Sequence, residues 1–281
     1  MSSPVVYFSV TSHGFGHAVR CSAIANAVKQ LDPNITIILS TVAPHWLLAS
    51  CLNGDFIQRH RQFDVGVIQA DSLQMDKEAT YERWQEIHRH RDRLIASEAE
   101  YLATNKVKLV FGDIPPLAGA IAKAAGVPCW LMSNFGWDFI YEDWGGKYLE
   151  LAEQIRGEYS QSDRLFRLPM HEEMASFSTI EDRGLVGNHP AQDLEHLRET
   201  FKLHSPKEKT ILLSFGGMGV DSLPYQDLQA FPDWQFISFD QKAPEIPNLV
   251  KISTHTYRPV DFMPYAIELC QNLAIVPLPR R

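Results

Sequence analysis

A short loop near the N-terminus carries two histidines and two glycines, in the order Ser12-His13-Gly14-Phe15-Gly16-His17. It follows a run of β-branched and aromatic residues and precedes a segment with helical spacing, which predicts a tight turn between a strand and a helix. Gly14 and Gly16 permit a close approach that a Cβ atom would obstruct. A neutral imidazole can take a proton from a hydroxyl group, so His17 is a candidate general base.

Two later segments are candidates for the same site. Asp113 follows a predicted strand over residues 108–111, and the aromatic stretch 133–141 follows the next predicted strand. Because the carboxyl ends of parallel strands face one crevice, we expect Asp113 to orient the imidazole of His17 and to stabilise its protonated form. Aromatic faces interspersed with polar groups suit a sugar.

Each of these motifs also has a purely structural interpretation. The glycines serve equally well in a turn whose histidines cap the helix or pack against it. Asp113 serves equally well as a helix N-cap, and aromatic clusters usually belong to hydrophobic cores. The first loop is not a dinucleotide-binding motif, because a third glycine is absent and no acidic residue directly follows the second predicted strand.

A second strand-to-glycine arrangement occurs at Ser214-Phe215-Gly216-Gly217-Met218-Gly219. Free backbone N–H groups in such a loop predict a cradle for a diphosphate. No Gly-Lys-Ser/Thr follows, which disfavours an ATPase P-loop. The pair His88 and His90 and the run His171-Glu172-Glu173 lack the spacing of a metal motif, so no metal is expected.

Strands and helices alternate along the chain, which predicts a doubly wound parallel sheet. We expect strands at 4–10, 35–40, 56–58, 66–69, 108–111 and 128–133, and helices at 18–31, 47–52, 78–105 and 116–125. A second α/β region is expected from strands at 210–215, 235–239 and 249–252, with a short helix at 225–231. The predicted organisation is an N-terminal Rossmann-like domain at 1–180, a connection at 181–208 and a partial second Rossmann-like domain at 209–281.

The composition, with 45% hydrophobic and 21% charged residues, is typical of a soluble globular protein. A net charge of −8 disfavours nucleic acid as a partner. No apolar stretch reaches the ~18–20 residues that span a bilayer, and no convincing leader precedes the first strand. A cytoplasmic location without a transmembrane segment is therefore expected. The four widely spaced cysteines predict buried thiols.

The loop around His17 resembles the Gly-His-Gly-x-Gly-His-Ala-x-Arg loop of GT-B-fold glycosyltransferases in the family 28 group. The resemblance is strongest to the glycosyltransferase-like N-terminal region of plant arabinokinases and related bacterial proteins. Further segments resemble this group in the same order, at 112–115, 133–141, 168–177, 214–217 and 257–262. The resemblance covers roughly residues 4–265.

This resemblance implies an α/β protein of GT-B type, with an acceptor-side domain followed by a donor-side domain. The implied reaction transfers a hexosyl or related group from a nucleotide-diphosphate sugar to a hydroxyl of a small-molecule or lipid acceptor, without a metal or other cofactor. His17 is the implied base and Asp113 its orienter. The residues implied to bind the acceptor are His13, Gly14, Gly16, Arg20, Asn134, Trp137 and Asp138. The residues implied to bind the donor are Ser214, Gly216, Gly217, Gly219, Tyr257 and Arg258.

The chain departs from the family pattern in two places. Ser12 replaces the usual first glycine of the loop, and after Tyr265 the chain runs to Arg281 without the donor segment that the family carries. We therefore expect a C-terminally truncated chain whose incomplete second domain leaves a strand edge open for association. Two alternatives to a transferase follow: a non-catalytic, truncated GT-B-like protein that binds a sugar or a partner, and a GT-B-fold nucleotide-sugar epimerase.

Overall fold

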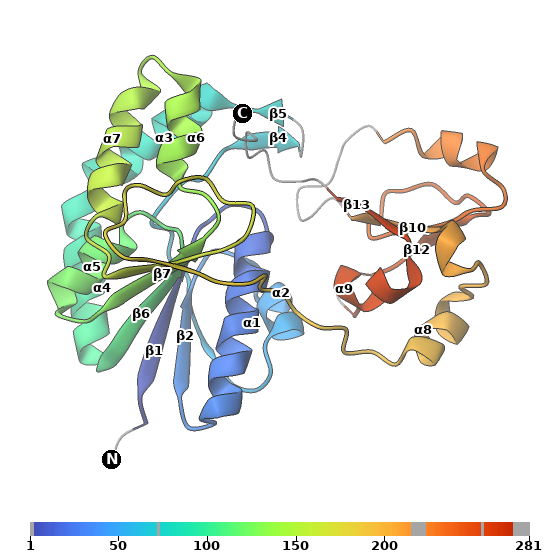
Figure 1. Ribbon diagram of the computed structural model, residues 1–281, viewed down its shortest axis with the longest axis horizontal. Helices are drawn as coiled ribbons and strands as arrows, with labels where there is room; N and C mark the ends of the chain where they lie inside the picture. Colours follow the sequence, from blue (N-terminus) through green and yellow to red (C-terminus); the bar gives the residue numbers. More distant parts are fainter. Residues whose placement is uncertain (1–2, 72–73, 215–222, 254–255, 272–281) are drawn as a thin grey trace. The chain divides into compact units, whose positions relative to one another are not determined.

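The computed structural model describes residues 3–71, 74–214, 223–253 and 256–271. Within these residues the chain forms two compact units (Figure 1). The first unit holds the described residues of Met1–Ile68 and Asp76–Gly187, and the second holds those of Gln69–Met75 and Asn188–Ile275. The first unit contains a seven-stranded sheet and the second a four-stranded one.

The seven strands of the first unit run parallel, in the order β3-β2-β1-β6-β7-β8-β9. They are β1 (Val5–Val10), β2 (Thr36–Ser40), β3 (Ile57–Arg59), β6 (Val107–Asp113), β7 (Cys129–Ser133), β8 (Arg164–Arg167) and β9 (Ile180–Asp182). From β1, the strands β2 and β3 extend the sheet in one direction, and the strands β6 to β9 extend it in the other, so the strand order reverses between β1 and β6. In open parallel sheets, such a reversal leaves a crevice at the carboxyl ends of the two strands, where ligands bind.

Helices cover both faces of this sheet (Figure 1). The helices of the unit are α1 (Gly16–Leu31), α2 (His45–Cys51), α3 (Lys77–Arg89), α4 (Arg91–Thr104), α5 (Ala118–Ala125), α6 (Trp137–Trp144) and α7 (Tyr148–Tyr159). Phe8 and Leu48 are buried where α1 and α2 pack on one face. On the other face Tyr7 donates a hydrogen bond to Glu98 of α4 at 2.5 Å. Successive residues of β1 point to opposite faces, so a strand covered on both faces needs the nearly continuous apolar run that β1 carries.

The structure corrects the single helix expected at 78–105. That segment forms α3 and α4, which meet at His90. No glycine or proline marks the break. Arg91, the first residue of α4, instead donates to a carboxylate oxygen of Glu158 in α7 at 2.5 Å. This contact joins residues that are 67 positions apart, which a local sequence pattern cannot reveal.

Other elements before residue 188 also differ from expectation. The strand expected at 66–69 is wrong, because residues 61–68 form no regular element and β4 (Gln69–Asp71) begins at the end of that range. β4 pairs with β5 (Gln74–Met75) in a short antiparallel ladder. Helices α6 and α7 and strands β8 and β9 were not predicted. The remaining strands and helices expected before residue 134 are present, with shifted ends.

The second unit contains a four-stranded parallel sheet in the order β12-β11-β10-β13. Its strands are β10 (Thr210–Ser214), β11 (Gln235–Ser238), β12 (Leu249–Lys251) and β13 (Glu268–Gln271), and its α-helices are α8 (Leu194–Phe201) and α9 (Pro259–Phe262). Leu197, Leu212, Ile237 and Phe262 form its core. The helix expected at 225–231 is a 3₁₀ helix, Tyr225–Ala230. In neither unit do the described residues include a helix long and apolar enough to cross a bilayer.

Candidate active site

The loop after β1 brings His17 to the carboxyl ends of β1 and β6. Gly14 adopts a φ of +58°, a left-handed conformation that a residue with a Cβ atom adopts with strain. The chain then enters α1 at Gly16 without a side-chain cap on the first turn. His17 is consequently held in that first turn, at the carboxyl edge of the sheet.

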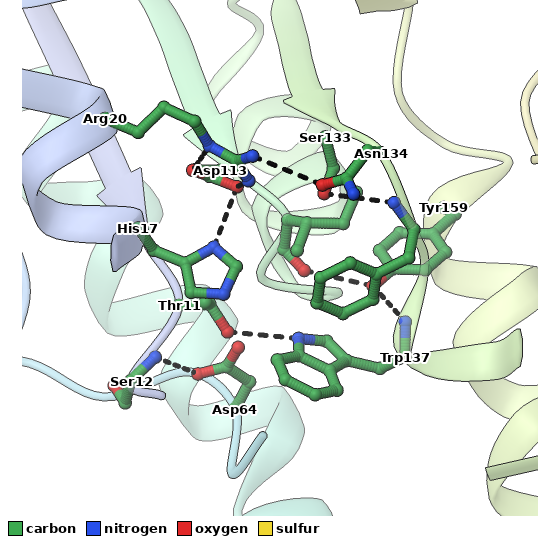
Figure 2. A network of polar contacts seen from close by, with 12 residues as sticks. Thr11, Ser12, His17, Arg20, Asp64, Asp113, Ser133, Asn134, Trp137 and Tyr159 are labelled. Atoms are coloured by element: carbon green, nitrogen blue, oxygen red, sulfur yellow. Dashed lines mark hydrogen bonds and ion pairs between the residues drawn. The ribbon is translucent and has the colours of Figure 1, made fainter. Parts of the chain in front are cut away.

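His17 and Asp113 form a hydrogen-bonded pair at this edge (Figure 2). Asp113 is the last residue of β6 and lies opposite Val10, the last residue of β1, in the ladder. His17 Nδ1 lies 2.9 Å from Asp113 Oδ1, and the carboxylate is fully buried. The other ring nitrogen, Nε2, makes no hydrogen bond to a residue that the structure describes, and 9% of the His17 side chain remains exposed. The pair thus has the geometry of an imidazole oriented by a carboxylate.

A second partner, Arg20, holds the same carboxylate. Its Nε and Nη2 atoms donate to Asp113 Oδ2 at 2.7 Å and Oδ1 at 2.8 Å, and its Nη1 donates to Asn134 Oδ1 at 3.2 Å. Burial alone would raise the pKa of Asp113, but Arg20 and His17 together lower that pKa to about 2. Asp113 is therefore ionised at neutral pH and can only accept hydrogen bonds.

The ionisation of Asp113 assigns the proton on His17. A carboxylate cannot donate, so Nδ1 of the imidazole must carry the hydrogen of this bond. In the neutral ring, Nε2 then has the free lone pair. The arrangement leaves a proton acceptor available at Nε2.

The residue after Asp113 has an unusual backbone conformation. Ile114 is fully buried and adopts a φ of +65°, a region that is a genuine outlier for a β-branched residue. Its carbonyl oxygen accepts a hydrogen bond from the Tyr159 hydroxyl at 3.0 Å, and that hydroxyl also accepts one from the Trp137 backbone N–H at 3.2 Å. Strain of this kind persists when surrounding contacts fix it, and it is frequent at active sites.

Aromatic rings surround the imidazole of His17. The centroid of Phe135 lies 6.0 Å from that of His17, and the centroid of Trp137 lies 6.2 Å from it. The indole Nε1–H of Trp137 donates to Thr11 Oγ1 at 3.1 Å, and the ring is almost completely buried (Figure 2). Trp137 therefore forms a fixed wall beside His17.

His13 is fixed by a neighbouring loop. Its Nδ1 lies 3.1 Å from the carbonyl oxygen of Val67 and 3.3 Å from the backbone nitrogen of the same residue. Gly66 has a φ of +62°, and a Cβ there would lie 2.5 Å from the Cβ of His13, so this close approach requires glycine. Burial, followed by the proximity of His17, lowers the pKa of His13 to about 4. His13 is neutral at neutral pH.

Asp64 is a buried acid that sequence reasoning missed. Its Oδ1 accepts a hydrogen bond from the backbone N–H of Ser12 at 2.9 Å, below His17 in the view of Figure 2. Burial raises its pKa to about 7. The only signal in the sequence is a single acid within the apolar run Phe63-Asp64-Val65-Gly66-Val67.

The structure does not bring every predicted acceptor residue to His17. Asn134 meets Arg20, and His13 and Trp137 lie near the imidazole. Asp138, in contrast, accepts a hydrogen bond from Ser176 at 2.6 Å and lies 3.8 Å from the guanidinium of Arg156.

The predicted donor residues lie in the second unit. Gly216, Gly217 and Gly219 fall outside the described residues, whereas Ser214 ends β10 and is buried. The ring of Tyr257 packs against Phe201 and Phe262. Arg258 donates to Asp261 at 3.0 Å and to the carbonyl oxygen of His189 at 3.2 Å. The described parts of both units contain no group of three or more His, Cys, Asp or Glu side chains placed to hold a metal ion.

The amino-acid sequence is similar to that of a known protein. No protein-family model matches the chain. Over 219 residues, which is 76% of this chain, the sequence is 29% identical to L-arabinokinase of Arabidopsis thaliana. The chain spans only about a fifth of the length of that relative, since the match covers 21% of it.

Solved structures with the same fold are glycosyltransferases. UGT89C1 of Arabidopsis thaliana complexed with quercetin matches with a TM-score of 0.58 at 13% identity, over 89% of this chain and 70% of that one. UGT2 of Phytolacca americana complexed with UDP-2fluoro-glucose and pterostilbene matches with a TM-score of 0.54 at 12% identity, over 98% of this chain and 72% of that one. A UDP-glucosyltransferase from Polygonum tinctorium capable of glucosylating indoxyl matches with a TM-score of 0.56 at 13% identity, over 85% of this chain and 65% of that one. The chain has the GT-B fold and resembles GT-B glycosyltransferases.

Proposed function

We propose that the chain is a glycosyltransferase that moves a sugar from a nucleotide-diphosphate donor to a hydroxyl group of an acceptor. The hydrogen bond of 2.9 Å between His17 Nδ1 and Asp113 Oδ1 supports this proposal most directly, because it leaves Nε2 as a base at the switch point of the sheet. The fold and the relatives support the same reaction class. A shared fold alone would not be sufficient support for a reaction class, since one fold hosts many reactions.

In the proposed reaction, His17 Nε2 takes the proton of the acceptor hydroxyl. The acceptor oxygen forms a bond to the anomeric carbon as the bond from that carbon to the diphosphate oxygen breaks. The nucleoside diphosphate leaves with the electron pair, and the configuration at the anomeric carbon inverts. Asp113 stabilises the imidazolium that results, and it keeps the ring in the tautomer with the proton on Nδ1.

The other residues hold this pair or face the substrates. Arg20 and Asn134 act as positioning residues, because the guanidinium binds Asp113 on one side and Asn134 on the other. His13, Gly14, Gly16 and Trp137 border the acceptor beside His17. The loop that contains Gly216, Gly217 and Gly219, together with Ser214, Tyr257 and Arg258, receives the donor diphosphate.

Replacing the base tests the proposal. We expect His17→Ala to lower the rate of transfer by ~10²–10⁴-fold without unfolding the protein, as loss of a general base does. UDP-glucose labelled in the sugar is the first donor probe, with a panel of hydroxyl acceptors. His45→Ala is the matched control, since His45 lies on α2 with an exposed bond to Gln58. A full rate in the His17 variant would rule out the proposed role.

Product analysis separates the proposal from an epimerase. A transferase gives labelled sugar bonded to the acceptor, and it gives no labelled glycoside when the acceptor is omitted. Labelled sugar with altered stereochemistry, formed equally without acceptor, would contradict transfer.

The proposed route uses side chains and no metal ion. We therefore expect the rate of transfer to be unchanged after dialysis against EDTA, measured with the same labelled donor. Loss of the rate in EDTA, with recovery on addition of a divalent cation, would contradict this part of the proposal.

A further inference from the structure

The loop at residues 168–177 lies against the segment between β7 and α6, and the proposed reaction gives it no role. It follows β8 and contains no helix or strand. Two backbone hydrogen bonds join it to that segment. The N–H of Leu168 donates to the carbonyl oxygen of Ser133 at 2.9 Å, and the N–H of Glu172 donates to that of Asn134 at 3.0 Å. The loop therefore supports the stretch of chain that leads from β7 into α6.

The side chain of Glu172 adds two hydrogen bonds from backbone N–H groups. Its Oε1 accepts from Gly136 at 3.1 Å, and its Oε2 accepts from Met174 at 2.5 Å. With its own N–H bonded to the carbonyl oxygen of Asn134, Glu172 contacts the residue before Phe135 and the residue after it. One residue of the loop thus holds the backbone on both sides of Phe135.

The loop itself has a conformation that its contacts fix. Met170 and Met174 have φ values of +60° and +58°, in the left-handed region that residues with a Cβ atom rarely adopt. Such conformations persist when surrounding contacts hold them, and the bond from the Met174 N–H to Glu172 is one of these contacts. The ring of Phe177 stacks on that of Tyr159, with the centroids 5.0 Å apart. A loop held in this way can fix the position of a neighbouring segment.

The segment that Glu172 holds carries two side chains that border the catalytic pair. The centroid of the Phe135 ring lies 6.0 Å from that of His17 and 5.2 Å from that of Trp137. The side chain of Asn134 accepts a hydrogen bond from Arg20, whose guanidinium also binds the buried carboxylate beside His17 (Figure 2). A displacement of the backbone at this segment therefore moves both side chains relative to the imidazole.

We infer that Glu172 is a positioning residue for the proposed transfer, because it holds Phe135 and Asn134 in place beside His17 through their backbone. The effect on the rate rests on the proposed function. The effect on the position of Phe135 does not, since that position can be measured without a substrate. A residue that only stabilised the loop would leave the ring of Phe135 where it is.

Proton NMR of the full chain without substrate tests the position of Phe135. The imidazole C–H signals of His17, assigned by their loss in His17→Ala, depend on the aromatic rings beside them. Phe135→Leu gives the position of these signals when the ring is absent. We expect Glu172→Ala to displace the His17 signals toward that position. Glu173→Ala is the matched control and should leave them in place, because Glu173 is the adjacent acid of the same loop and is exposed.

Initial rates with the labelled donor measure the consequence for transfer. We expect Glu172→Ala to lower kcat by roughly tenfold to 10²-fold, since a displacement of about 1 Å near the reacting groups has an effect of this size. Glu172→Asp keeps a carboxylate on a shorter side chain and should recover part of the rate. Ser176→Ala is the control for a loosened loop, because the Ser176 hydroxyl donates to Asp138 at 2.6 Å and its loss leaves the bonds of Glu172 intact. Its kcat should stay close to that of the original chain.

Two outcomes would overturn the inference. One is a set of His17 signals in Glu172→Ala that coincides with that of the original chain. The other is an equal loss of kcat in Glu172→Ala and Ser176→Ala. A lack of transfer by the original chain would instead contradict the proposed function, and the NMR comparison would then decide alone whether Glu172 positions Phe135.

Discussion

Asp113 lies between His17 and Arg20, and these two partners have different roles at the level of single residues. The carboxylate of Asp113 orients the imidazole of His17. The guanidinium of Arg20 keeps that carboxylate ionised, because it opposes the effect of burial on its pKa. Without Arg20, only His17 would oppose the effect of burial, so the pKa of Asp113 would be higher than in the original chain. A protonated Asp113 could no longer accept the Nδ1–H bond that fixes the tautomer of His17.

Arg20→Met tests this dependence through the pH profile of transfer. We expect the variant to lose roughly 10²-fold or more of the rate at pH 6, and to recover part of it at higher pH as Asp113 ionises. Arg20→Lys should recover part of the loss, since one positive charge remains near the carboxylate. Initial rates between pH 5.5 and 9 provide the measurement. A uniform loss at every pH in the methionine variant would show that Arg20 has only a structural role.

The residues of the pair could be predicted because each lies at or just after the carboxyl end of a predicted strand. Asp113 ends β6 and His17 lies in the first turn of the helix after β1, and parallel strands place such positions at one edge of the sheet. Asp64 and Tyr159 could not be predicted in this way. Asp64 lies in a segment without regular structure, and Tyr159 ends a helix whose packing depends on contacts remote in sequence. The role of Arg20 beside Asp113 likewise becomes visible only when the two side chains meet.

At the scale of elements, Tyr159 connects the loop after β6 to the start of α6. Its hydroxyl donates to the carbonyl oxygen of Ile114 and accepts from the N–H of Trp137, so one group satisfies two buried backbone atoms. We expect Tyr159→Phe to lower the free energy of unfolding by about 1–3 kcal/mol, because both atoms lose their partner. Urea denaturation measures this change.

Tyr148→Phe is the control for that measurement. Its hydroxyl meets the exposed Glu78 at 3.3 Å, so its loss should change stability by no more than about 0.5 kcal/mol. Equal losses in the two tyrosine variants would contradict the bridging role of Tyr159.

Local patterns predicted the elements whose signals are local. The strands β1, β2, β6, β7, β10, β11 and β12 stand out where apolar runs end in glycine or polar loops, whereas β8, β9 and β13 have no such signal. Gly126 closes α5 with a φ of +69°, as its position suggests. The break between α3 and α4 at His90 has no such signal, and α6 was hidden because its aromatic residues resemble a ligand-binding loop. Those two features depend on tertiary packing.

At the scale of the whole molecule, two buried groups should affect stability in opposite directions as the pH changes. Asp64 has a pKa of about 7 in the folded chain against 3.8 ordinarily, so between these values the folded state binds more protons and stability falls as pH rises. His13 has a pKa of about 4 against 6.5 ordinarily, so the unfolded state binds more protons and stability rises with pH. Asp113 matters only below its ordinary value of 3.8, where stability is lost as pH falls toward about 2.

Asp64→Asn should therefore reveal the effect of His13. Each unit of pH contributes about 1.4 kcal/mol per group, so the contributions of Asp64 and His13 nearly cancel between pH 4.5 and 6.5 in the original chain. In the variant we expect the free energy of unfolding to rise by roughly 2–3 kcal/mol as the pH increases from 4.5 to 6.5, whereas the same two groups nearly cancel in the original chain. Urea denaturation followed by tryptophan fluorescence suits this test, because Trp46, Trp84, Trp130, Trp137 and Trp144 lie in the first unit. Parallel pH curves for the original chain and the Asp64 variant would show that Asp64 ionises normally in the folded protein.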